Sequence, residues 1–86
     1  MISIIIPAYN YAQYLPEALD SLLAQSEKDW ECIIINNGSF DNTADVAKNY
    51  VSKDNRFRYF EIENKGVSNS RNFALKQCKG FFIQFL

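Results

Sequence analysis

The hydrophobic residues of this chain fall into short unbroken runs and longer spaced patterns that follow one another along the sequence. Two of the runs are pure isoleucine, at residues 4–6 and 33–35. A continuous apolar run is typical of a strand that is buried on both faces, as in a parallel sheet covered by helices. Between these runs, leucine and alanine recur every three or four residues, which predicts an amphipathic helix. The pattern therefore predicts strands that alternate with helices.

Seven elements are expected in the order strand, helix, strand, helix, strand, helix, strand. The strands are expected at residues 2–7, 31–36, 56–62 and 81–86, and the helices at about 13–25, 42–52 and 68–79. Such alternation implies right-handed crossovers and a parallel sheet. The third strand is rich in charge, which is typical of a sheet edge. We predict an α/β fold of three layers, Rossmann-like, with a parallel sheet of about four strands in the order 3-2-1-4 and helices on both faces.

The composition narrows the class of protein. The chain has 86 residues and a net charge of −1, so we interpret residues 1–86 as one small domain without the basic excess of a nucleic-acid-binding protein. It contains no apolar run long enough for a membrane span and no secretory signal. The absence of histidine excludes a Ser-His-Asp triad and any His-ligated metal site in this chain. We interpret Cys32 and Cys78 as reduced core thiols of a cytoplasmic protein.

The first two strands end in residues that could contact a ligand, because open parallel sheets bind ligands just past the carboxyl ends of their strands. The first ends in Pro7, Ala8 and Tyr9, and Tyr9 could stack on a base. The plainer alternative is a strand-to-helix loop with Tyr9 packed. The second ends at Asn37, whose amide could read one edge of a base. Here the alternative is a turn in which Asp41 or a neighbour caps the next helix.

Arg71 is expected in the first turns of the third helix. Helix N-termini favour anions, so this arginine could hold a phosphate; a solvated surface arginine is the alternative. Tyr11 and Tyr14 are interpreted as packing and surface residues. The sequence has neither a GxGxxG dinucleotide fingerprint nor a GxxxxGK[ST] phosphate loop.

Four blocks together, SIIIPAYN, YLPEALDSLLAQS, DWECIIINNGSFDNT and NKGVSNSRNFALKQCKGFFIQFL, closely resemble the N-terminal half of family 2 glycosyltransferases with the GT-A fold. The resemblance implies that the chain binds the nucleotide of an activated sugar, with a UDP-sugar as the expected donor. Pro7, Ala8 and Tyr9 would surround the base, position 37 would read its edge, and Arg71 would lie near the base or phosphate. The whole enzyme would transfer a glycosyl group to an acceptor hydroxyl in polysaccharide or cell-surface glycan synthesis.

The chain departs from the family pattern in two ways. Asn36 and Asn37 stand where the family usually has two aspartates. The family's Asp-x-Asp motif, which holds Mg²⁺ or Mn²⁺, would follow a strand like residues 82–86, where this sequence stops. We therefore expect the metal only in a full-length enzyme, and we expect this chain to be inactive alone, with no catalytic or metal-binding residue. The alternative is a non-catalytic nucleotide-binding or assembly module with the same fold.

The last predicted strand is strongly apolar. If it lies at a sheet edge, its free backbone groups can recruit another chain. We expect self-association through residues 81–86.

Overall fold

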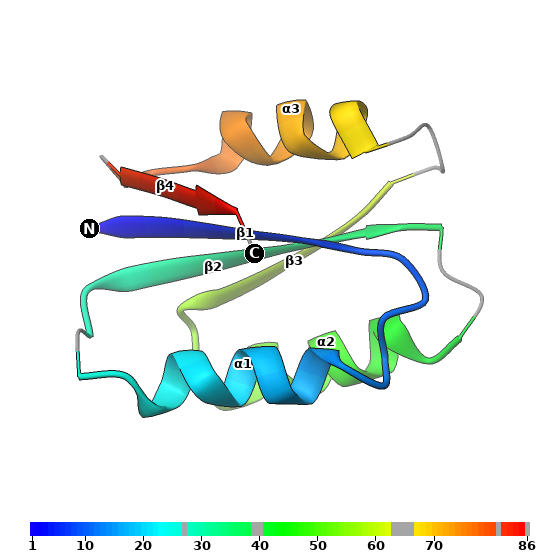
Figure 1. Cartoon of the computed structure of the whole chain (residues 1–86), viewed down its shortest axis with the longest axis horizontal. Coiled ribbons are helices and arrows are strands. Elements are labelled where there is room, and N and C mark those ends of the chain that lie inside the picture. The colour runs from blue at the N-terminus through cyan, green and yellow to red at the C-terminus, as the bar shows by residue number, and fades with distance from the viewer. Residues whose placement is uncertain (27, 39–40, 63–66, 81, 86) are drawn as a thin grey trace.

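The computed structural model describes residues 1–26, 28–38, 41–62, 67–80 and 82–85, with the backbone alone for 67–71 and 82–85. It contains four strands and three helices (Figure 1). The elements in chain order are β1 (Ile2–Ala8), α1 (Leu15–Ala24), β2 (Trp30–Asn37), α2 (Thr43–Lys53), β3 (Phe57–Ile62), α3 (Val67–Gln77) and β4 (Phe82–Phe85).

The strands form one parallel sheet in the order β3-β2-β1-β4. Helices α1 and α2 lie together against one face, and α3 lies against the other (Figure 1). The predicted fold class, strand order and three layers are therefore confirmed. Within the described part of the chain, no helix is both long and apolar enough to cross a membrane.

The expected end of the first strand at Pro7 is wrong by one residue. Pro7 pairs with Ile35 of β2, and β1 continues to Ala8. On its other side, β1 pairs with β4 only over Ile2–Ile5. At Pro7, β1 therefore has no described neighbour on the β4 side. A proline is tolerated at such a position, because no carbonyl of a described strand there needs the N–H that proline lacks.

The hydrophobic core is divided by the sheet, because successive side chains of a strand point to opposite faces. Ile4, Ile6 and Ala8 of β1 belong to the cluster under α1 and α2. Ile5, with Ile33 and Ile35 of β2, belongs to the cluster under α3. Both clusters are almost closed to solvent, which is why the two central strands carry uninterrupted isoleucine.

A buried polar cluster joins the amino-terminal ends of the strands to the turn between α3 and β4. The Glu31 carboxylate, 5% exposed, accepts hydrogen bonds from the Ser3 hydroxyl (2.6 Å) and the Lys79 backbone N–H (2.6 Å). Its other oxygen lies 3.3 Å from the Arg58 guanidinium. The Ser3 oxygen in turn accepts the Gly80 N–H (2.9 Å). One carboxylate thus connects β1, β3 and the segment that leads into β4.

The Glu31 cluster makes stability depend on pH. Burial raises the pKa of the Glu31 carboxyl, but the bonds from Ser3, Lys79 and Arg58 outweigh burial and hold that pKa below its usual 4.5. The folded protein therefore binds this proton less tightly than the unfolded chain does. The resulting stability is present above pH 4.5 and is lost as the pH falls through the lowered value. We expect the urea midpoint to fall with acidification below pH 4.5, and to fall less steeply in Glu31→Gln. Equal slopes for the two proteins would contradict this assignment.

The predicted edge position of the third strand is confirmed, although the strand begins at Phe57, one residue after Arg56. Arg56 and Arg58 do more than provide charge to this edge. Arg56 binds Asp54 (2.6 Å) and lies over the Trp30 ring, 4.0 Å from its centroid. Arg58 donates to the Gln77 carbonyl (2.8 Å) as well as contacting Glu31. Strand β4 lies at the opposite edge. The side chains of residues 81–86 lie outside the described part of the chain, so self-association through them stays a prediction.

Candidate functional site

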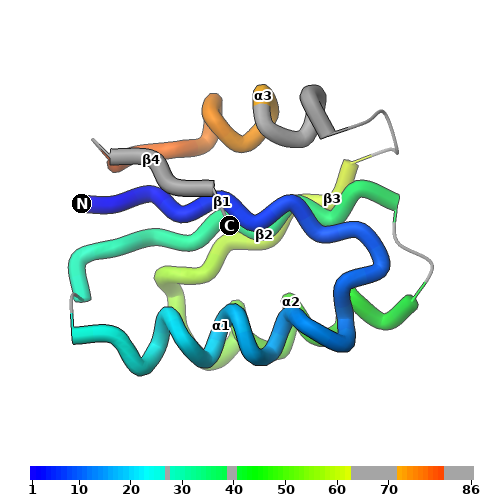
Figure 2. The backbone as a smooth tube through the Cα atoms, viewed as in Figure 1, coloured from blue at the N-terminus to red at the C-terminus, as the bar shows by residue number. Residues whose placement is uncertain are grey.

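The loops that follow β1 and β2 leave the same edge of the sheet, the carboxyl edge, where α3 also begins (Figures 1 and 2). Each loop turns through a residue in the left-handed backbone region, Asn10 (φ 50°) after β1 and Gly38 (φ 74°) after β2. Asparagine and glycine tolerate this conformation better than other residues. The fold therefore brings together two sharply turned loops that lie far apart in the sequence.

The three residues predicted to surround the base, two at the end of β1 and one in the loop after it, have different surroundings. Tyr9 is 48% exposed, so its side chain is not packed in the core, and its stacking on a base stays a prediction. Ala8 is 1% exposed and packs in the core under α1 and α2. Its side chain cannot reach a ligand, and any contact would come from its backbone. Pro7 is half-buried, on the opposite face of β1 from Ala8.

Asn36 and Asn37 are adjacent but face opposite layers. Asn36 is on the face of α1 and α2, 1% exposed, where its amide N–H donates to the Tyr59 hydroxyl (2.9 Å). Asn37 shares the α3 face with Ile33 and Ile35, and it is 6% exposed at the end of β2. Asn36 therefore connects two strands, while Asn37 lies on the same face as Pro7, toward the end of the sheet where α3 begins.

Asp41 lies one residue before the N-cap of α2, which is Asn42, and no N-cap side chain there makes a cap hydrogen bond, so the predicted capping by Asp41 is wrong. Its Oδ1 instead accepts the Thr43 N–H (3.0 Å) across the turn that leads into α2. Its Oδ2 accepts the Ala12 N–H (3.2 Å), and the Thr43 hydroxyl oxygen accepts the Tyr11 N–H (3.0 Å). Sequence reasoning missed this connection between the two loops, because its partners lie about thirty residues apart.

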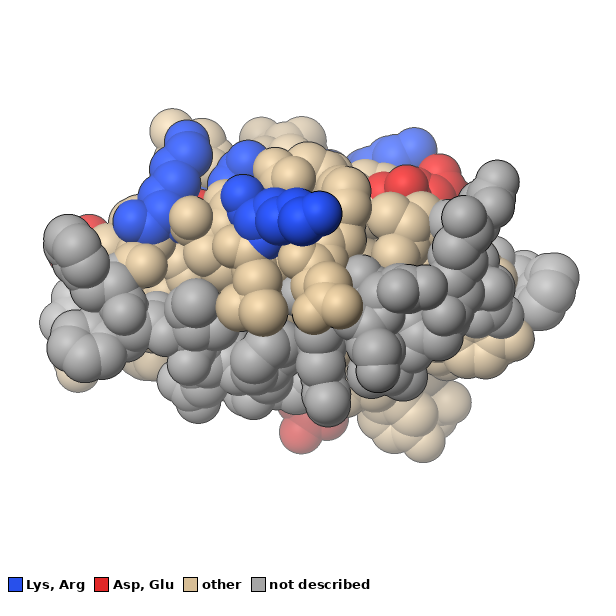
Figure 3. Space-filling model, turned by 90° about the horizontal axis from the view of Figure 1, so that it is seen from above, with Lys and Arg blue, Asp and Glu red and all other residues tan. Residues whose placement is uncertain are grey.

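Arg71 lies within α3, whose N-terminus is at the carboxyl edge of the sheet, but its side chain lies outside the described residues. Its expected role at the base or phosphate stays a prediction. In the view onto the α3 face, lysine and arginine side chains are visible, together with some acidic side chains (Figure 3). Arg58, on that side of the sheet, already binds Glu31 and the Gln77 carbonyl.

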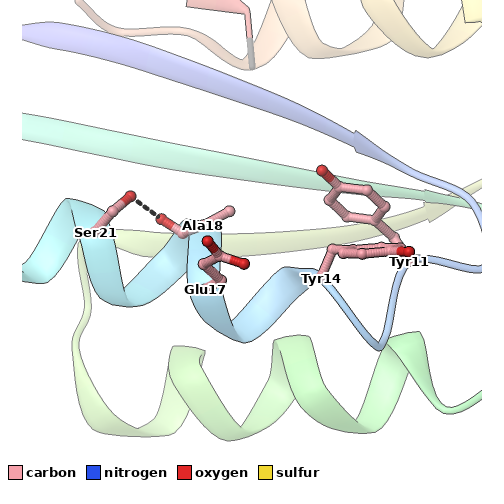
Figure 4. A pocket seen from close by; sticks show the side chains of 5 residues that line it. All are labelled: Tyr11, Tyr14, Glu17, Ala18 and Ser21. Atoms are coloured by element: carbon pink, nitrogen blue, oxygen red, sulfur yellow. Dashed lines mark hydrogen bonds between the residues drawn. The ribbon is translucent and has the colours of Figure 1, made fainter.

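An open pocket of about 420 Å³ lies beside the first loop, along α1 (Figure 4). It is lined by Tyr11, Tyr14, Glu17, Ala18 and Ser21. The two tyrosine rings are 5.7 Å apart and both are exposed, so the interpretation of these tyrosines as surface residues is confirmed. None of the residues proposed to hold the nucleotide lines this pocket, which we therefore do not assign to the nucleotide.

The part of the chain that the structure describes has no group of three or more Cys, Asp, Glu or His side chains that could hold a metal ion. Cys32 is buried and Cys78 is half-buried, and both are free thiols, as predicted. Burial raises the pKa of the Cys32 thiol, which makes this thiol inert.

Comparison with known proteins decides the family. Residues 3–86 match the family model described as glycosyl transferase family 2. The chain belongs to this family. The glycosyltransferase EpsJ of Bacillus subtilis, described as uncharacterized, is 37% identical over 86 residues, which is 100% of this chain and 25% of EpsJ. The glycosyltransferase GlyA of Streptococcus pneumoniae is 36% identical over 85 residues, which is 99% of this chain and 12% of GlyA. The chain thus spans about a quarter or less of the length of these relatives.

Solved structures of glycosyltransferases have the same arrangement of elements. Residues 1–349 of Staphylococcus aureus TarS, in complex with UDP-GlcNAc, match with a TM-score of 0.90 and 30% identity over 99% of this chain and 25% of theirs. The mannosyltransferase PcManGT from Pyrobaculum calidifontis, in complex with GDP-Man and Mn²⁺, matches with a TM-score of 0.82 and 22% identity, over 95% of this chain and 25% of its own. This family 2 chain therefore has the GT-A fold.

Proposed function

We propose that this chain holds the nucleotide of a UDP-sugar donor between the loop after β1 and the end of β2. The observation that supports this most is the convergence of Tyr9 and Asn37 at the carboxyl edge of the sheet. TarS, which has the same fold over this region, was crystallised with UDP-GlcNAc. The exposed ring of Tyr9 offers a stacking surface, and Asn37 offers the donor and acceptor of an amide.

The remaining proposed contacts come from the backbone and from α3. Pro7 and the backbone of Ala8 would form the wall of the base pocket beside Tyr9. Arg71 would contribute positive charge near the N-terminus of α3, where a helix favours anions. In the whole enzyme the donor would give its glycosyl group to an acceptor hydroxyl, in polysaccharide or cell-surface glycan synthesis. The two free thiols fit a cytoplasmic location.

A divalent metal, Mg²⁺ or Mn²⁺, is the expected cofactor of a full-length enzyme with this fold. The residues described here do not fit such an ion, because no group of three suitable ligands gathers among them. We therefore assign no step of transfer to a metal held by these residues, and we expect this chain alone to bind a nucleotide without transferring sugar. A non-catalytic nucleotide-binding or assembly module is the second candidate, favoured by the two asparagines at 36 and 37.

Asn37→Asp should tighten binding of UDP by about threefold to tenfold. A carboxylate accepts a hydrogen bond from a base N–H more strongly than an amide does, and position 37 is where we place that contact. The affinity is to be measured by NMR titration or calorimetry on the purified chain. An unchanged dissociation constant would remove position 37 from the site.

Asn36→Asp is the matched control, because it makes the same chemical change one residue away on the opposite face. Asn36 is buried against Tyr59, so the added charge should lower stability without tightening UDP. If Asn36→Asp lowered the dissociation constant for UDP as much as Asn37→Asp, the effect would come from net charge. The assignment of position 37 to the site would then fail.

A further inference from the structure

The loop after β1 is bound by two residues at the entry to α2, Asp41 and Thr43. Two consecutive backbone N–H groups of the loop are bound there: Tyr11 donates to the Thr43 hydroxyl oxygen (3.0 Å), and Ala12 donates to Asp41 Oδ2 (3.2 Å). Thr43 is fully buried. These bonds begin two residues after Tyr9 and one residue after Asn10, where the backbone enters the left-handed region.

Asp41 and Thr43 also bind each other, and this contact fixes the direction of the Thr43 hydroxyl proton. A threonine hydroxyl has one proton to donate and lone pairs with which to accept. The Thr43 hydroxyl donates that proton to Asp41 Oδ1, which also accepts the Thr43 backbone N–H (3.0 Å). With its proton directed to the carboxylate, the hydroxyl can only accept from Tyr11. The carboxylate thus fixes the direction of the bond that holds the loop.

We propose that Asp41 and Thr43 are positioning residues for the nucleotide, which hold the loop that follows Pro7 and Ala8 and carries Tyr9 in its binding conformation before the ligand arrives. This inference rests on the proposed function. A loop ordered in advance does not lose conformational freedom when the ligand binds, so affinity is higher for the same contacts. Neither residue needs to touch the nucleotide, and the fully buried Thr43 side chain is directed to Asp41 and the loop.

The Thr43 hydroxyl can be tested with two substitutions of similar size. Thr43→Val keeps the shape and removes the hydroxyl, whereas Thr43→Ser keeps the hydroxyl and removes a methyl group. In Thr43→Val we expect amide hydrogen exchange at Tyr11 to accelerate about fivefold or more, and the dissociation constant for UDP to rise about fivefold, as for the loss of one hydrogen bond. Thr43→Ser should stay close to the parent chain in both. A role limited to packing would not produce this rescue by serine.

A second pair of variants changes exposed residues only, so the test remains possible if Thr43→Val, at a buried position, does not fold. Asp41 is exposed, and Asp41→Ala removes the acceptor for Ala12 and for the Thr43 hydroxyl. Asp45→Ala makes the same change of charge at an exposed position in the first turn of α2. We expect faster exchange at Tyr11 and Ala12 and weaker UDP binding in Asp41→Ala, and neither effect in Asp45→Ala.

The outcomes separate this inference from the proposed function. If the parent chain binds no UDP, the proposed function fails, and the inference fails with it. If the parent binds UDP but Asp41→Ala and Thr43→Val bind it equally well, the inference alone is overturned. Unchanged exchange at Tyr11 and Ala12 in both variants would also overturn it. Faster exchange together with weaker binding, restored by Thr43→Ser, supports it.

Discussion

Glu31→Gln should lower the free energy of unfolding by about 2–3 kcal/mol. The carboxylate accepts from the Ser3 hydroxyl and the Lys79 N–H on one oxygen and faces Arg58 with the other. Glutamine has one oxygen, so its NH₂ group must face either the donors on one side or the guanidinium on the other. The estimate is below that for a fully buried ion pair, because the Arg58 side chain is 29% exposed and can rehydrate.

Urea unfolding followed by the fluorescence of Trp30, the single tryptophan, measures this loss. Glu61→Gln is the control, since it removes the same charge at an exposed position of β3. It should change stability by no more than about 0.5 kcal/mol. If the two variants were equally stable, the buried cluster would contribute nothing beyond a surface charge.

Gly80→Ala should be destabilising by about 2 kcal/mol, because a side chain has no room at this position. An added Cβ would lie 2.6 Å from the Ser3 hydroxyl oxygen, 2.7 Å from the Met1 carbonyl oxygen and 2.9 Å from the Ser3 backbone nitrogen. Two of these atoms belong to the backbone of the chain at β1, which cannot rotate away. The turn before β4 must therefore move, and the Gly80 N–H then loses its bond to Ser3.

The same urea titration measures this change, with Lys79→Ala as the neighbouring control. Lys79 is exposed, and its contact with Glu31 is made by the backbone N–H, which alanine retains. We expect Lys79→Ala to unfold near the parent midpoint. A midpoint for Gly80→Ala that is no lower than that of Lys79→Ala would show that the turn adjusts at no cost.

The strand order follows from the sequence because a strand covered on both faces is apolar along most of its length. The isoleucine runs therefore identified the central strands, and the charges of Arg56 and Arg58 identified an edge. The Glu31 cluster was not predicted, since its partners lie 28 and 48 residues away and pairing at that distance leaves no local pattern. A glutamate beside Cys32 at the start of a strand resembles an ordinary surface charge.

The candidate site could be predicted only to the level of strand ends. The rule for parallel sheets places the ligand there, but it does not say which side chains face it. The sequence did hold one signal for this choice, because successive side chains of a strand point to opposite faces of the sheet. This alternation places Pro7 and Ala8 on opposite faces, and likewise Asn36 and Asn37. The loop bonds of Tyr11 and Ala12 had no such signal, because backbone N–H groups are the same at every residue.

The opposite orientation of Asn36 and Asn37 makes two neighbouring codons independent targets for engineering. A library of substitutions at position 37 would explore the α3 face of the sheet end, where we propose that the nucleotide base lies, while the hydrogen bond from Asn36 to Tyr59 joins β2 to β3. Selection for a different nucleotide base can therefore begin at position 37 with Asn36 unchanged, and because Asn37 is only 6% exposed, the stability of each variant is to be measured beside its affinity. Substitutions at position 36 would mainly change the stability of the fold. A library that varied both positions would therefore not distinguish an effect on nucleotide binding from an effect on folding.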